Sequence, residues 1–117
     1  VRFSRAPTTE GTLRPDFIFP GIAWYRDEAF PQDQLTMLGV KATCKDRWRQ
    51  VLNEAARVPR KHLLTLEPGI SQNQTREMGE ENVQLVIPLP IQPTFRAAQL
   101  PTLMSVEGFI AHVKARQ

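Results

Sequence analysis

Cysteine is almost absent from this sequence, because Cys44 is the only one among 117 residues. A lone thiol cannot form an internal disulfide, which excludes a small disulfide-stabilised secreted domain and makes the cytoplasm the expected compartment. Long apolar runs are also missing. The longest uncharged stretch, residues 82–95, contains three prolines and is too short to cross a bilayer, so we expect no membrane span.

We do not expect the first residues of the sequence to be a secretory signal. Residues 1–14 begin with Val, contain three arginines and one glutamate, and have no apolar core. We expect them to form an irregular lead-in, and we expect the chain to be the C-terminal part of a longer protein. Residues 1–117 have the length of a single domain rather than two.

Acidic residues are outnumbered by basic ones, 12 against 15, which gives a net charge of +3. The surplus lies between Lys41 and Lys61, where seven basic residues accompany only Asp46 and Glu54. A basic block of this kind fits a polyanion such as nucleic acid. On charge alone, a solvated helix face is the alternative.

Apolar periodicity and turn residues predict an alternation of strands and helices. The expected strands are residues 16–21, 22–26, 37–43, 62–66 and 83–87, the second of them returning from the first as a hairpin. The expected helices are residues 46–58, 71–82 and 105–115. We expect residues 88–93 to form an extended connection. This order predicts an α/β fold with a central mixed sheet flanked by helices.

Two of these helices show an apolar stripe at helical spacing. The helix over residues 46–58 is expected to begin at the cap Asp46 and to end before Pro59. Its predicted buried stripe is Trp48, Val51, Leu52 and Ala55. The last helix is expected to begin at the cap Ser105, and its predicted stripe is Val106, Phe109, Ile110 and Val113.

Three charged residues are placed to reach one shared point. Asp16 follows Pro15 at the first strand, Lys41 lies on the face of the third strand opposite its apolar side, and Glu54 lies on the next helix. Phosphodiester hydrolysis needs oxygen ligands for a hard divalent cation and a positive group that positions water. Two carboxylates and a lysine supply that set, although each residue alone also fits a solvated surface role.

Gly39 occupies the position, two residues before the lysine, where the commonest nuclease pattern has an acid. A helix packed beside the strand can send a carboxylate into the space that a glycine leaves. Glu54 is placed to do this.

These residues resemble a known family. Pro15-Asp16, the run over residues 39–50 and Glu54 closely resemble the catalytic domain of EcoRII-type restriction endonucleases. That group belongs to the PD-(D/E)xK nuclease superfamily, in the branch whose second acid lies on the helix. The resemblance runs from about Asp16 to the C-terminus and implies a restriction-endonuclease-like core formed by a single nuclease domain.

The resemblance also implies roles for individual residues. Asp16 and Glu54 would bind Mg²⁺ and Lys41 would be the catalytic lysine. Lys45, Asp46 and Arg47 would recognise C·G pairs. An arginine bidentate to guanine, beside a carboxylate that accepts from cytosine N4, recognises a C·G pair in the major groove, so Arg47 and Asp46 suit that role.

The implied activity is type II restriction: Mg²⁺-dependent cleavage of double-stranded DNA at CCWGG or CCNGG sites by a homodimer. A cognate DNA methyltransferase is the implied genetic partner. Two alternatives stay open. One is a DNA-binding or dimerisation fragment that does not cleave, and the other is a mismatch-nicking repair endonuclease of the same superfamily.

Four further residues have more than one interpretation. Tyr25 either contacts DNA or packs within the hairpin. Cys44 is expected to be a packed residue rather than a nucleophile. His62 and His112 lack the spacing of zinc ligands, and we expect no zinc site.

Overall fold

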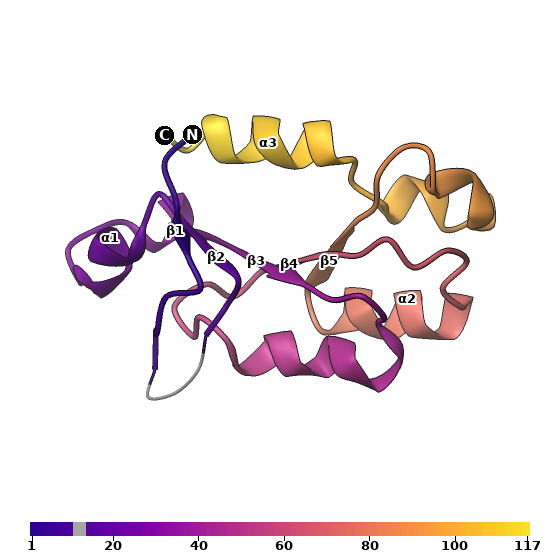
Figure 1. The fold of residues 1–117 in the computed structure, drawn as a ribbon, viewed down its shortest axis with the longest axis horizontal. Coiled ribbons are helices and arrows are strands. Elements are labelled where there is room, and N and C mark those ends of the chain that lie inside the picture. The colour runs from indigo at the N-terminus through magenta and orange to yellow at the C-terminus, as the bar shows by residue number, and fades with distance from the viewer. Residues whose placement is uncertain (11–13) are drawn as a thin grey trace.

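The computed structural model describes residues 1–10 and 14–117; the side chain of Asp46 lies outside the described part. The described residues form a five-stranded sheet in the order β1-β2-β3-β4-β5 (Figure 1). Its strands are β1 (Ser4–Arg5), β2 (Phe17–Phe19), β3 (Thr36–Val40), β4 (Lys61–Leu64) and β5 (Val83–Val86). The helices are α1 (Ile22–Arg26), α2 (Gln72–Glu80) and α3 (Val106–Lys114), with 3₁₀ segments η1 (Gln32–Gln34), η2 (Lys45–Asn53), η3 (Gln92–Thr94) and η4 (Leu100–Thr102).

The sheet is mixed. The strands β1, β2 and β3 pair antiparallel, whereas β3, β4 and β5 pair parallel. Phe17 pairs with Leu38 across β2 and β3, and continuing this register by one residue places Asp16 opposite Gly39. The expected α/β class with a central mixed sheet flanked by helices is confirmed.

Helices cover both faces of the sheet (Figure 1). The helix α3 lies on one face, and η2 and α2 lie on the other. Phe19, Leu38 and Phe109 belong to the apolar cluster under α3, whereas Trp48 and Val51 belong to the larger cluster under η2. Met37 of β3 also belongs to the cluster under η2, so β3 is apolar on both faces, which corrects the prediction that only the face opposite Lys41 is apolar.

The prediction of a returning strand over residues 22–26 is wrong, because these residues form α1. Both edges of β2 are already occupied, one by β3 and the other by β1. The strand β1 lies within residues 1–14, which we expected to be irregular. The hydroxyl of Ser4 accepts a hydrogen bond from the Ile22 amide at 2.9 Å, so β1 also anchors the first turn of α1.

The helix predicted over residues 46–58 is shorter than expected. It is the 3₁₀ segment η2, it begins after Cys44, and it ends at Asn53. Trp48, Val51 and Ala55 of the predicted stripe are buried. The helix ends early because Ala55 takes a left-handed conformation with φ 50°, and the carbonyls of Glu54, Ala55 and Val58 accept hydrogen bonds from the Lys61 ammonium.

The two later helices match their predicted positions. The Ser71 hydroxyl accepts from the Gln74 amide and that of Ser105 from the Gly108 amide, as expected of N-caps. Phe109 and Val113 of the last stripe are buried, whereas Val106 is half-buried and Ile110 is 43% exposed. Residues 88–93 include the start of η3 rather than an extended segment throughout. No described helix is long and apolar enough to span a membrane.

A buried histidine lies between β4 and α3. The His62 side chain is 2% exposed, and its ring lies 5.2 Å from that of Phe109 and 4.8 Å from that of His112. Neither ring nitrogen has a hydrogen-bond partner among the described residues. Burial, followed by the positive charges of His112, Arg60 and Arg116, lowers the pKa of His62 to about 3.

This histidine predicts acid sensitivity of the fold. Its ordinary pKa is about 6.5, so the unfolded chain binds the proton first and stability falls as the pH drops from about 6.5 towards 3. We expect His62 to account for about 2 kcal/mol of stability lost between pH 7 and pH 5. Urea denaturation of His62→Phe at both pH values should show a much smaller difference than wild type. An unchanged difference would contradict the prediction.

Candidate active site

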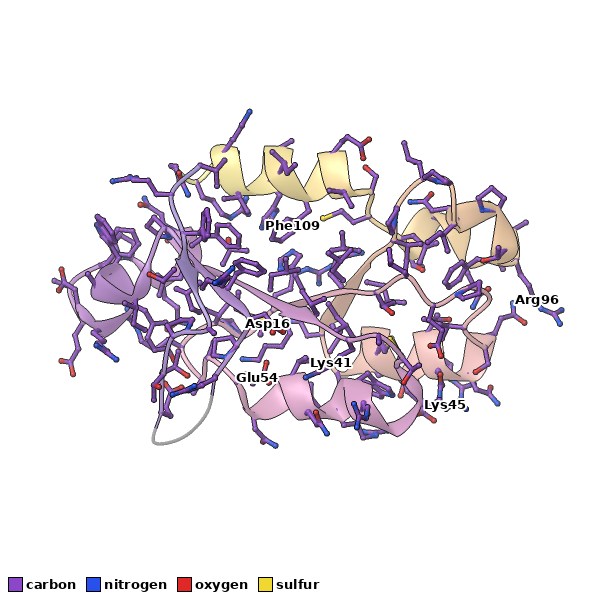
Figure 2. The ribbon with its side chains drawn as sticks, viewed as in Figure 1. Asp16, Lys41, Lys45, Glu54, Arg96 and Phe109 are labelled. Atoms are coloured by element: carbon purple, nitrogen blue, oxygen red, sulfur yellow. The ribbon has the colours of Figure 1, made fainter. Side chains whose placement is uncertain are left out.

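The structure brings Asp16, Lys41 and Glu54 together. Asp16 directly precedes β2, Lys41 directly follows β3, and Glu54 directly follows η2. Figure 2 shows the three side chains between the sheet and η2. The antiparallel pairing of β2 with β3 and the packing of η2 beneath them therefore bring three segments of the chain to one point.

Backbone contacts hold the first two residues in place. The Asp16 carbonyl accepts a hydrogen bond from the Ala6 amide at 2.6 Å, and its Oδ2 accepts one from the Val40 amide at 2.6 Å. The Lys41 amide donates to the Leu64 carbonyl at 3.1 Å. Asp16 is thus fixed by strands on both sides, and Lys41 is fixed to β4.

Because Gly39 has no side chain, the Glu54 carboxylate can lie beside the backbone of β3. A Cβ at Gly39 would lie 2.8 Å from Cγ1 of Val51 and 3.7 Å from Oε1 of Glu54. The first distance is shorter than van der Waals contact, so a side chain here is excluded without a shift of η2. The Glu54 carboxylate therefore lies beside the backbone position where an acid on the strand would begin.

This crowding makes Gly39→Ala destabilising. Val51 is fully buried and must move to admit the methyl group, so we expect a loss of about 1 to 3 kcal/mol in the free energy of unfolding. Gly79→Ala is the matched control, because a Cβ there meets nothing within 4 Å and α2 should gain about 0.5 to 1 kcal/mol. Urea denaturation measures both. Equal stability of Gly39→Ala and wild type would show that η2 packs less tightly than described.

Glu54 is a buried carboxyl group without full hydrogen bonding. It is 9% exposed, and its Oε1 has no partner among the described residues. Burial raises its pKa; Lys41 opposes this, Asp16 adds to it, and Lys61 opposes it. A buried, unpaired carboxylate oxygen beside a second carboxylate and an ammonium group is typical of a functional site rather than of a structural core.

The donor set fits a hard divalent cation. Asp16 and Glu54 offer carboxylate oxygens, which Mg²⁺ prefers, and Mg²⁺ is commonly held by one or two carboxylates with water completing its shell. The unpaired Oε1 of Glu54 is the observation that favours this fit. Among the described residues there is no group of three or more His, Cys, Asp or Glu side chains that could hold a metal ion.

The predicted recognition segment lies at the other end of η2. Lys45 and Arg47 are exposed near the start of this segment, and Figure 2 shows Lys45 far from Glu54. The side chain of Asp46 lies outside the described residues. Both described side chains are therefore accessible to a large ligand, at a distance from the three clustered residues.

Tyr25 is a packing residue in this structure. Its side chain is 3% exposed, and its hydroxyl donates to the Glu10 carboxylate and accepts from the Arg57 amide at 3.2 Å. Burial raises its pKa to about 12. Of the two interpretations of Tyr25, packing agrees with this burial and with these hydrogen bonds.

Cys44 is also packed. It is fully buried, its amide donates to Oε2 of Glu67 at 3.0 Å, and burial raises the pKa of its thiol to about 11. A thiol with this pKa is protonated at neutral pH and is a poor nucleophile. The expected packing role is consistent with this environment.

Several residues of the basic block make contacts with other residues of the protein, and those of Arg49 and Arg60 are exposed. Arg49 pairs with Glu77 at 3.0 Å, and Arg60 donates to the side chains of Asn82 and Gln84. Arg57 binds several backbone carbonyls, including that of Phe30 at 2.9 Å. The block is therefore a smaller polyanion surface than its charge count indicates.

Two contacts near the site were not expected from the sequence. Lys61 is buried and binds carbonyls directly after η2, and Glu10 accepts from the Ala56 amide at 3.3 Å. A lysine at the start of a strand is usually exposed to solvent, and so is a glutamate in a polar segment such as residues 1–14. Neither residue carries a signal of its partner in the sequence.

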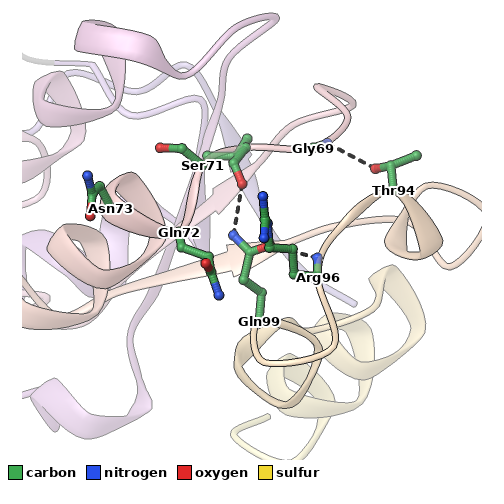
Figure 3. Close-up of a pocket in the computed structure, with 8 residues that line it drawn as sticks. Gly69, Ser71, Gln72, Asn73, Thr94, Arg96 and Gln99 are labelled. Atoms are coloured by element: carbon green, nitrogen blue, oxygen red, sulfur yellow. Dashed lines mark hydrogen bonds between the residues drawn. The ribbon is translucent and has the colours of Figure 1, made fainter.

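A separate polar hollow of about 550 Å³ opens at the start of α2 (Figure 3). The Gln99 amide holds it together, since it donates to the Ile70 carbonyl at 2.8 Å and accepts from the Arg96 amide at 2.8 Å. The residues that line the hollow are Gly69, Ile70, Ser71, Gln72, Asn73, Thr94, Arg96 and Gln99. None of the three clustered site residues is among them.

Comparison with known proteins identifies the family. The sequence profile described as "EcoRII C terminal" matches residues 1–110. The chain belongs to the EcoRII C-terminal family. Its curated relative, the type II restriction enzyme EcoRII of Escherichia coli, is 46% identical over 111 residues, which cover 95% of this chain and 28% of that enzyme. This EcoRII C-terminal chain thus spans about a quarter of the relative's length.

Solved structures show the same fold. Two structures of metal-depleted Ecl18kI, in complex with uncleaved DNA and with uncleaved, modified DNA, each superpose with a TM-score of 0.80 at 19% identity. Each match covers 98% of this chain and 39% of the Ecl18kI chain. The EcoRII C-terminal chain therefore has the restriction-endonuclease-like α/β fold expected from its sequence.

Proposed function

We propose that this chain is the catalytic domain of a Mg²⁺-dependent, sequence-specific endonuclease that hydrolyses phosphodiester bonds in double-stranded DNA. The observation that carries the proposal is the meeting of Asp16, Lys41 and a buried, unpaired Glu54 carboxylate at Gly39. Membership of the EcoRII C-terminal family supports it. The relative that is 46% identical to this chain is named a type II restriction enzyme.

In this proposal each residue of the cluster has one task. Asp16 and Glu54 bind Mg²⁺ through carboxylate oxygens. Mg²⁺, when bound, would supply Lewis-acid chemistry that stabilises charge on the phosphate and activates water for attack. The Lys41 ammonium orients the attacking water and offsets the negative charge that develops on the phosphate. The hydrogen bond from the Val40 amide keeps Asp16 oriented before the substrate arrives.

Recognition is assigned to the start of η2. Lys45, Asp46 and Arg47 would contact C·G pairs of a CCWGG or CCNGG site in the major groove. A homodimer would place one such segment on each half of a nearly symmetric site. In this proposal residues 1–117 form a single catalytic domain. The enzyme acts in the cytoplasm, and a cognate DNA methyltransferase is its genetic partner.

A cleavage assay on plasmids with mapped CCWGG and CCNGG sites tests the function. We expect Mg²⁺-dependent double-strand breaks at one class of site and no cleavage in EDTA. Binding without cleavage would favour the non-cleaving fragment. Nicks in one strand at mismatched duplexes would favour the repair endonuclease.

Arg47 tests recognition separately from chemistry. Because its guanidinium is expected to contact guanine, Arg47→Ala should cost about 1 to 3 kcal/mol of binding and should reduce discrimination against exchanged outer C·G pairs. Competition binding in Ca²⁺ between a CCWGG duplex and an exchanged duplex measures this. Arg76→Ala is the control, because it lies on α2 in an exposed pair with Glu80. Equal discrimination by wild type and Arg47→Ala would rule out this role.

A further inference from the structure

Lys61 is buried, and its ammonium donates hydrogen bonds to backbone carbonyls. The residue is 5% exposed, and its Nζ donates to the carbonyls of Glu54 at 2.7 Å, Ala55 at 2.8 Å and Val58 at 2.6 Å. These three acceptors match the three donors of an ammonium group. Burying a lysine is unfavourable unless its hydrogen bonds are satisfied, and here they are.

The segment held by Lys61 is the turn that carries Glu54. Glu54 has extended backbone angles directly after η2, and Ala55 is left-handed, so the chain reverses direction here. Glu10 contacts the same turn, because its Oε1 accepts a hydrogen bond from the Ala56 amide at 3.3 Å. The backbone that directs the Glu54 side chain is thus bound by two charged residues from distant parts of the sequence.

We propose that Lys61 is a positioning residue that sets the place of the Glu54 carboxylate beside Asp16 and Lys41. This inference rests on the proposed role of Glu54 as a metal ligand. Lys61 hydrogen-bonds the backbone at residues 54, 55 and 58, and it makes no hydrogen bond to Asp16 or Lys41 in the described structure. Its removal should therefore act on the site through the turn, and through the loss of a positive charge that lowers the pKa of Glu54.

The neighbouring carbonyls explain why an ammonium is needed. Without it, three carbonyl oxygens lose a donor, although that of Ala55 still accepts from the Val58 amide at 2.9 Å, and the turn relaxes towards water or towards a longer helix. Either change redirects the bond from Cα to Cβ of Glu54 and so moves the carboxylate from its place beside Gly39, where an added Cβ would lie 3.7 Å from Oε1. Residues that orient a metal ligand typically change metal affinity by about 10- to 100-fold when they are replaced.

The experiment compares Lys61→Met, Lys61→Gln and the control Lys114→Met, which changes an exposed lysine on α3. Electron paramagnetic resonance of free Mn²⁺ measures binding of the metal alone without DNA. We expect Lys61→Met to weaken Mn²⁺ binding by about 10-fold or more and Lys61→Gln, which keeps an amide donor, to weaken it less. DNA affinity in EDTA and the circular dichroism spectrum should match wild type, and Lys114→Met should match wild type in every measurement.

Lys61→Gln carries the test if Lys61→Met fails to fold. Unchanged Mn²⁺ affinity in a folded Lys61 variant overturns the inference, as does an equal loss of Mn²⁺ and DNA affinity, which would indicate general loosening. Adding Lys61→Gln to Glu54→Gln should cause no further loss of Mn²⁺ binding. Should Glu54→Gln itself bind Mn²⁺ and cleave as wild type does, the proposed function of Glu54 fails instead.

Discussion

Replacing Glu54 with glutamine is expected to reduce DNA cleavage by orders of magnitude while making the fold more stable. The amide keeps the size of the side chain but cannot supply a charged oxygen ligand. Loss of a ligand needed mainly in the transition state lowers the cleavage rate more than it lowers DNA affinity. Single-turnover cleavage at saturating enzyme measures the first effect.

The gain in stability follows from the environment of Glu54. Burial raises the pKa of this carboxyl, so its charged form is disfavoured in the folded protein at neutral pH. A neutral amide removes that penalty, and the midpoint of thermal unfolding without metal should rise. Glu28→Gln, at an exposed position, is the control and should change neither quantity. Wild-type cleavage by Glu54→Gln would mean that the second acid lies elsewhere.

Lys41→Ala is expected to abolish cutting and to retain DNA binding. An ammonium that orients water and offsets charge on the phosphate acts mainly on the transition state, so its loss appears in the rate. Cleavage in Mg²⁺ and binding in Ca²⁺ measure the two steps separately. Lys114→Ala, on the exposed side of α3, provides the control. A Lys41→Ala variant that fails to bind would show instead that Lys41 is a simple phosphate contact.

The element order was largely predictable because buried strands and capped helices are encoded locally. The apolar runs around Leu63 and Leu85 became β4 and β5, and the caps Ser71 and Ser105 marked two helix starts correctly. The prediction of a strand over residues 22–26 was wrong because the aromatic composition of this segment is typical of strands. Its true state depends on which segment pairs with β2, and that contact is not local.

The candidate site was predictable only in part, for a related reason. Asp16, Lys41 and Glu54 have a recognisable chemistry and spacing, and the structure brings them together. Lys61 and Glu10 bind backbone carbonyl and amide groups. Every residue offers those groups, so no residue type in the sequence identifies the partners of such a contact.

The segment η2 connects the residues proposed to recognise DNA with Glu54, which is proposed to bind the metal. Lys45 begins it and Glu54 follows its last residue, and nine residues at about 2 Å each make a rod of about 18 Å. If Lys45 and Arg47 contact the bases, a mismatched base pair would tilt η2. That tilt would move the Glu54 carboxylate at the other end of the segment. Discrimination between DNA sites would then appear as a difference in turnover and not only as a difference in occupancy.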